Sequence, residues 1–136
     1  MLFRSDERQE DLRNAEQSLQ SEEAKLARLN TALAEAQAQA QPLQDALTVA
    51  DAQLTQAQSA VAAAPQDEGA KQSLAQASAA RDAAKQALDA HPRTLAQLNA
   101  EMDSAQTARE TAKVRRDAAL AEKDKAESDL NRANAR

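Results

Sequence analysis

Leucine recurs at every seventh residue through most of the first half of the chain. The series runs in one phase over eight heptads and is interrupted by a single alanine. Its members are Leu12, Leu19, Leu26, Leu33, Ala40, Leu47, Leu54 and Val61. Residues seven apart return to the same face of a helix every two turns, and three or four such heptads already indicate a coiled coil. The repeat therefore predicts a long helix with one narrow apolar stripe.

A second repeat follows in the other half of the chain and completes the predicted seam. Three residues after each member of the first series stands a companion position, which is mostly alanine. The second half repeats this arrangement, with an alanine-rich stripe beside a leucine stripe that four cations interrupt. The apolar seam residues predicted there are Leu74, Leu88, Leu95, Leu98 and Met102. The two halves therefore predict an all-α fold in which one stripe packs against the other.

The apolar side chains are too small and too few for a thick core. Of the 136 residues, 36 are alanine and only 21 are larger aliphatic residues, methionine or phenylalanine. Burying alanine removes little surface from water, so these side chains cannot fill the interior of an ordinary globular domain. Alanine, leucine, glutamine, glutamate, lysine and arginine all favour helix. The composition is typical of a coiled coil or a long helix.

A short segment between the two repeats predicts a chain reversal. Pro65 and Gly69 are unfavourable inside a helix, and Asp67 can cap the helix that follows. Pro42 and Pro92 lie within the repeats, where each removes one backbone hydrogen bond and is expected to kink its helix. We therefore expect a long antiparallel two-helix coiled-coil hairpin with proline kinks. The alternative is a four-helix bundle that reverses at both prolines.

The hairpin divides the chain into four parts. We expect a coiled-coil arm over residues 8–64, a turn over 65–69 and a second arm over 70–134. Residues 1–7 are expected to be disordered or non-native, because Leu2–Ser5 match the translation of a common sequencing adapter. Arms of this length would each reach about 85 Å.

The pairing register of the two arms has two solutions. In an antiparallel pair, facing residues have numbers that add to a constant. A total of 138 places Leu47 opposite His91 and Ala40 opposite Leu98, so that a large residue faces a small one in nearly every layer. A total of 131 instead places Leu33 opposite Leu98. The sequence favours 138 because close packing pairs large residues with small ones.

Charge and residue chemistry exclude several classes of function. The net charge is -5 and Phe3 is the one aromatic residue, whereas nucleic-acid binding needs cations for phosphates and aromatic rings for bases. The chain has no cysteine and a single histidine, His91, so we expect no metal, cofactor, small-molecule or catalytic site. No apolar run approaches the length of a membrane span, so no membrane insertion is expected. The residues leave the compartment open between the cell envelope and the cytoplasm.

After residue 5 the chain resembles the alanine-rich antiparallel coiled-coil segments of larger bacterial proteins. In composition and heptads it is similar to the helical hairpins of periplasmic membrane-fusion adaptors and to the coiled coils that space domains in envelope proteins. The resemblance implies a non-catalytic structural spacer or oligomerisation module that is a fragment of a larger protein, with partners that are proteins or further copies. The alternative it implies is a hairpin that docks a partner protein through its turn.

Overall fold

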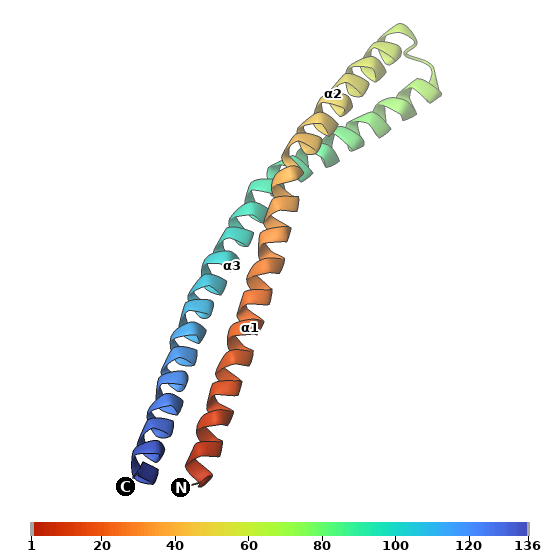
Figure 1. The fold of residues 1–136 in the computed structure, drawn as a ribbon. Coiled ribbons are helices and arrows are strands. Elements are labelled where there is room, and N and C mark those ends of the chain that lie inside the picture. The colour runs from red at the N-terminus through yellow and green to blue at the C-terminus, as the bar shows by residue number, and fades with distance from the viewer. Residues whose placement is uncertain (1, 136) are drawn as a thin grey trace. The chain divides into compact units, whose positions relative to one another are not determined.

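The computed structural model is all-helical and describes residues 2–135, with side chains described from Asp6 onward (Figure 1). The helices are α1 (Leu2–Ala38), α2 (Ala40–Ala63) and α3 (Glu68–Ala135). No strand occurs between residues 2 and 135. The all-α fold class is therefore confirmed. It follows from a composition of strong helix formers with a single glycine and three prolines.

The division between α1 and α2 lies at Gln39, three residues before Pro42. The Gln39 amide donates to the Ala36 carbonyl at 3.1 Å, which is the shorter i to i−3 bond, and the Leu43 amide donates to the Gln39 carbonyl at 3.0 Å. Starting a new helix at Ala40 places Pro42 in a first turn, where an N–H group has no partner within the helix. The missing donor of Pro42 therefore costs no helical hydrogen bond.

Pro92 has a different outcome, because α3 continues through it without interruption. The four-helix bundle with a reversal at each proline is therefore wrong. One interior proline removes a single hydrogen bond, and the residues on either side are strong enough helix formers to continue the helix.

The connection between α2 and α3 is shorter than the predicted turn over 65–69. It spans Ala64–Asp67, and Gly69 lies in the first turn of α3 with a negative φ. The Asp67 carboxylate accepts a hydrogen bond from the Gly69 amide at 2.9 Å, which caps the start of α3. The start of α3 is therefore fixed by the Asp67 cap, and the reversal does not require the conformational freedom of glycine.

The residues expected to form a disordered or non-native start belong to α1 from Leu2 onward. Met1 lies outside the described residues. Whether the first residues are native stays a prediction.

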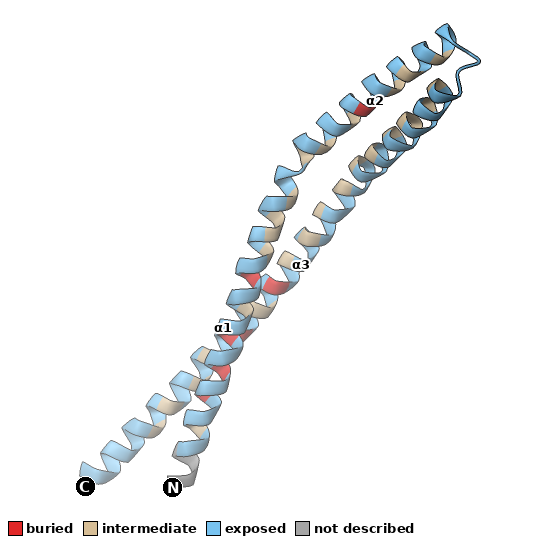
Figure 2. Cartoon of the chain, turned by 90° about the vertical axis from the view of Figure 1, so that its right-hand side faces the viewer, coloured by how far each residue is buried: buried red, intermediate tan, exposed pale blue. Residues whose placement is uncertain are grey.

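The helices form two compact units. The terminal unit contains the chain up to Thr31 and from Ala100 onward, and the turn unit contains Ala32–Asn99. The buried residues of the terminal unit are Leu12, Ala15, Leu19, Leu26, Ala105 and Ala112. Within the described residues of the turn unit, Ala50 alone is buried (Figure 2). The terminal unit therefore has the better shielded interior.

Candidate functional site

The residues shielded from solvent recur with a period of seven in both units. In the terminal unit Leu12, Leu19 and Leu26 are buried. The other predicted seam residues are half-buried: Leu33, Ala40, Leu47, Leu54, Val61, Leu74, Leu88, Leu95, Leu98 and Met102. Leu130, which continues the same phase, is 55% exposed. The shielded positions thus form a stripe on each helix, and the two stripes of a unit supply its interior.

The most buried positions are alanines of the companion stripe, which the list of predicted seam residues left out. Ala15 and Ala105 are each 1% exposed, against 8% for Leu12. Ala50 and Ala112 are buried as well. A side chain of one carbon lets the neighbouring helix come close enough to exclude water completely. The signal that could have found them is the alanine recurring three residues after each leucine.

Contacts inside the turn unit correct the preferred register. The Nε2 atom of His91 lies 2.6 Å from the carbonyl oxygen of Ala36, and the Nε atom of Arg81 donates to the Asp51 carboxylate at 3.0 Å. These pairs have residue numbers that add to 127 and 132, and both totals are closer to 131 than to 138. The register of 138, with His91 opposite Leu47, is wrong. A slip of one heptad keeps the same stripes together, so the size of the side chains alone did not determine the register.

His91 occupies a defined place beside the division between α1 and α2. The Ala36 carbonyl that it contacts also accepts the Gln39 amide. A helix leaves its last carbonyl groups without partners inside the helix. The His91 ring, with hydrogen on Nε2, therefore satisfies a carbonyl at the end of α1.

One polar side chain in the terminal unit has a buried oxygen atom without a hydrogen-bond partner. The Oε2 atom of Glu22 is buried and has no hydrogen-bond partner among the described residues. Glu22 stands at a companion position where most other heptads have alanine. Removing a carboxylate oxygen from water without a partner is unfavourable, so Glu22 lowers the stability of this interior.

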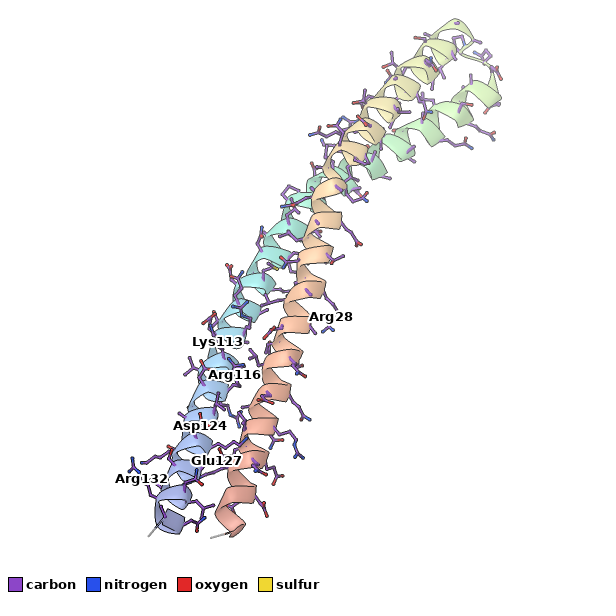
Figure 3. The ribbon with its side chains drawn as sticks, viewed as in Figure 1. Arg28, Lys113, Arg116, Asp124, Glu127 and Arg132 are labelled. Atoms are coloured by element: carbon purple, nitrogen blue, oxygen red, sulfur yellow. The ribbon has the colours of Figure 1, made fainter. Side chains whose placement is uncertain are left out.

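Charged side chains cover the terminal unit, but the ion pairs of two of its arginines are local. Arg109 pairs with Glu110 at 3.3 Å and Arg116 with Asp117 at 2.9 Å, in each case the next residue of α3. Arg28 of α1 and Arg132 of α3 extend outward from the pair of helices (Figure 3). Exposed pairs of this kind contribute about 0 to 1 kcal/mol each. They add little to the stability of the unit.

The predicted turn residues are fully accessible. Pro65, Asp67 and Gly69 are all exposed. Their side chains supply one carboxylate, which is engaged in the cap of α3. The turn therefore presents a surface, without the convergent polar groups of a catalytic pocket.

Two further properties concern metals and membranes. In the part of the chain that the structure describes, no three His, Cys, Asp or Glu side chains are grouped to hold a metal ion. Within residues 2–135, no helix combines the length and the apolar character needed to cross a bilayer.

The chain matches no known family model, no curated protein and no solved structure.

Proposed function

We propose that the chain is a non-catalytic antiparallel coiled-coil hairpin that acts as a structural spacer or oligomerisation module. The observation that carries the proposal is the period of seven in the shielded residues of both units. Such a period is the pattern by which two helices pack along a common seam. A function of spacing needs length and stiffness, and it needs no pocket.

The small alanine side chains at the companion positions support this proposal. Ala15 and Ala105 are almost completely shielded, as expected where two helices approach closely. The long unbroken helix α3, of 68 residues, supports it as well, because most helical stability in proteins comes from packing one face of a helix against a partner. The few large apolar residues are then sufficient, since a seam has little interior to fill.

Small-angle scattering of the dilute protein tests the proposal. A hairpin with arms of the predicted length has a largest dimension of about 85 Å or more. A compact bundle of the same mass has a largest dimension of roughly 50 Å. A value near the smaller figure, or a far-ultraviolet spectrum with little helix, would exclude the hairpin.

The exposed turn provides a second test, directed at the alternative in which the turn docks a partner. Residues 65–69 are replaced with an unrelated tight turn, and helix content and melting temperature are compared with those of the original chain. A structural spacer tolerates this exchange, because its length and stiffness do not depend on the residues of the turn. Loss of function with unchanged helix content and melting would favour docking through the turn.

A further inference from the structure

One face of the turn unit is built from uncharged residues on two neighbouring helices. On α2 the stripe recurs at alternating steps of three and four residues, and α3 has an equivalent stripe. We call the two stripes together the uncharged face, and its residues are Ala46, Val49, Gln53, Gln56, Ala60 and Ala63 of α2 with Ser73, Gln76, Ala80, Ala83, Ala87 and Ala90 of α3. All of them are exposed. The face is therefore accessible along its whole length.

The two stripes belong to one surface, because a single groove joins them. The groove is lined by Gln53, Gln56 and Ala57 of α2 and by Ser73, Gln76, Ala77 and Ala80 of α3. Five of these seven residues are members of the uncharged face, and they come from both stripes. The face is thus two helices wide, with a groove between its stripes at residues 53–57 and 73–80.

The charged residues of α2, and those of α3 between residues 70 and 97, lie off this face. On α2 both of the acidic residues, Asp45 and Asp51, are off the stripe, and Asp51 pairs with Arg81 on the other side of the shielded positions. The charged residues of α3 from residue 70 to residue 97 are also off the stripe: Lys71, Arg81, Asp82, Lys85, Asp89 and Arg93. The uncharged face therefore has none of the charges of α2 or of this part of α3, and the first charge along the continued stripe is Glu35 of α1.

The same helical positions in the terminal unit are charged. There the stripe of α1 includes Asp11, Lys25 and Arg28, and the stripe of α3 includes Arg115, Glu122 and Lys125. Helix propensity does not explain this difference, because lysine, arginine and glutamate suit exposed helix positions nearly as well as alanine does. The lack of charge on the uncharged face is consistent with a face that is covered when the protein functions.

We infer that the uncharged face binds the same face of a second copy of this chain. The inference rests on the proposed coiled-coil function and specifies its partner. A surface without charge meets its own copy without repulsion, and its glutamine side chains can donate to and accept from one another across the contact. A partner helix with charged side chains would find no opposite charge on this face.

The size of the face and the weak interior of the turn unit favour the same partner. Each stripe covers 18 residues, from 46 to 63 and from 73 to 90, and so spans about 27 Å. Two helices side by side are about 20 Å wide, so two copies would bury about 1,000 Å² in total, an area typical of weak and transient complexes. Ala50 is the one buried residue among the described residues of the unit, so a second layer supplies the shielding that two helices lack. The dimer is expected to be reversible and dependent on concentration.

Sedimentation equilibrium of a matched pair of double variants tests the inference. Ala60→Lys with Ala83→Lys places two cations on the uncharged face, whereas Ala62→Lys with Ala75→Lys makes the same chemical change at exposed positions off it. The original chain and the second variant are expected to form a dimer between about 10 μM and about 1 mM. Ala60→Lys with Ala83→Lys is expected to raise the dissociation constant of the dimer at least about tenfold.

Three results would overturn the inference: a monomer throughout this range for the original chain, equal dimerisation of both variants, or equal loss of the dimer in both. Circular dichroism of each dilute variant establishes that its helices are intact. A dilute monomer that is extended in scattering but never dimerises contradicts only the inference. A compact dilute monomer contradicts the proposed function itself.

Discussion

The smallest side chains occupy the most buried positions in the terminal unit. Ala15 and Ala105 are almost fully shielded, whereas the valine of α3 at position 114 is 66% exposed. Exclusion of water at a helix pair depends on how closely the backbones approach, and a single methyl group permits the closest approach. Substituting a larger residue at either alanine would force the helices apart and expose the leucines beside them.

Glu22 is the shielded residue whose replacement should improve the protein. Glu22→Leu removes a carboxylate oxygen that has no partner and adds apolar surface to the interior. We expect the free energy of unfolding to rise by about 1 to 2 kcal/mol, measured by urea denaturation followed by circular dichroism. Glu23→Leu, at the exposed neighbour, serves as the control and should change it by less than about 0.5 kcal/mol. A loss of stability in Glu22→Leu would show that the carboxylate has a stabilising partner.

His91 should stabilise the end of α1. His91→Ala removes the contact with the Ala36 carbonyl, which then retains the Gln39 amide as its donor. We expect a loss of about 1 kcal/mol and faster amide hydrogen exchange at Gln39. Asp89→Ala, at an exposed position of the same helix, should leave the exchange of Gln39 unchanged. Unaltered exchange in both variants would contradict this role of His91.

At the scale of the helices, Pro42 determines where α1 gives way to α2. Pro42→Ala restores an amide that can donate to the Ala38 carbonyl, so one continuous helix becomes possible. Proline is about 3 kcal/mol less favourable than alanine inside a helix, and the greater freedom of the unfolded chain offsets about 0.4 to 1 kcal/mol. Pro42 lies in a first turn, where its missing N–H costs no helical hydrogen bond, so only part of this difference applies. We therefore expect the free energy of unfolding to rise by about 1 kcal/mol when the two helices join.

Pro65→Ala is the matched control and should change stability in the opposite direction. Pro65 lies in the exposed connection, where its ring restricts the unfolded chain and interrupts no helix. Its loss should cost about 0.4 to 1 kcal/mol. Thermal melts of both variants make the comparison, and a loss of stability in Pro42→Ala would mean that the division at Gln39 is favourable in itself.

The register can be measured by disulfide formation, because the chain has no cysteine of its own. Leu33→Cys with Leu98→Cys should form a disulfide readily, as the register of 131 places these half-buried residues opposite each other. Ala40→Cys with Leu98→Cys should form one slowly, because a heptad separates the two residues along the helix axis. The reverse order of rates would restore the register of 138.

These helices show which parts of the fold were predictable from the sequence. The all-α class was predictable because nearly every residue favours helix and the apolar residues repeat every seven. The division at Gln39 was not, because the energy of a proline depends on where the next helix starts. The register was not either, since each heptad of leucine and alanine looks like the next. Contacts of Arg81 and His91, which are polar residues on the stripe, distinguish the two registers in the structure.

At the scale of the whole molecule, buried residues and charged outer positions are both concentrated in the terminal unit. The terminal unit has most of the buried residues and charged outer positions, whereas the turn unit has one buried residue and the uncharged face. A unit of two helices with so little interior gains most from an added layer. The proposed dimer would add this layer where the intrinsic stability is lowest.

Thermal stability should therefore depend on protein concentration. A partner that binds only the folded chain stabilises it by mass action, so a dimer melts at a higher temperature when it is more concentrated. Between about 10 μM and about 500 μM we expect the melting temperature of the original chain to rise by roughly 2 to 4 °C, measured by circular dichroism in cells of different path length. Ala60→Lys with Ala83→Lys should melt at one temperature across the range, while Ala62→Lys with Ala75→Lys should follow the original chain. A melting temperature that is independent of concentration in all three proteins would mean that the folded chain is stable without a second copy.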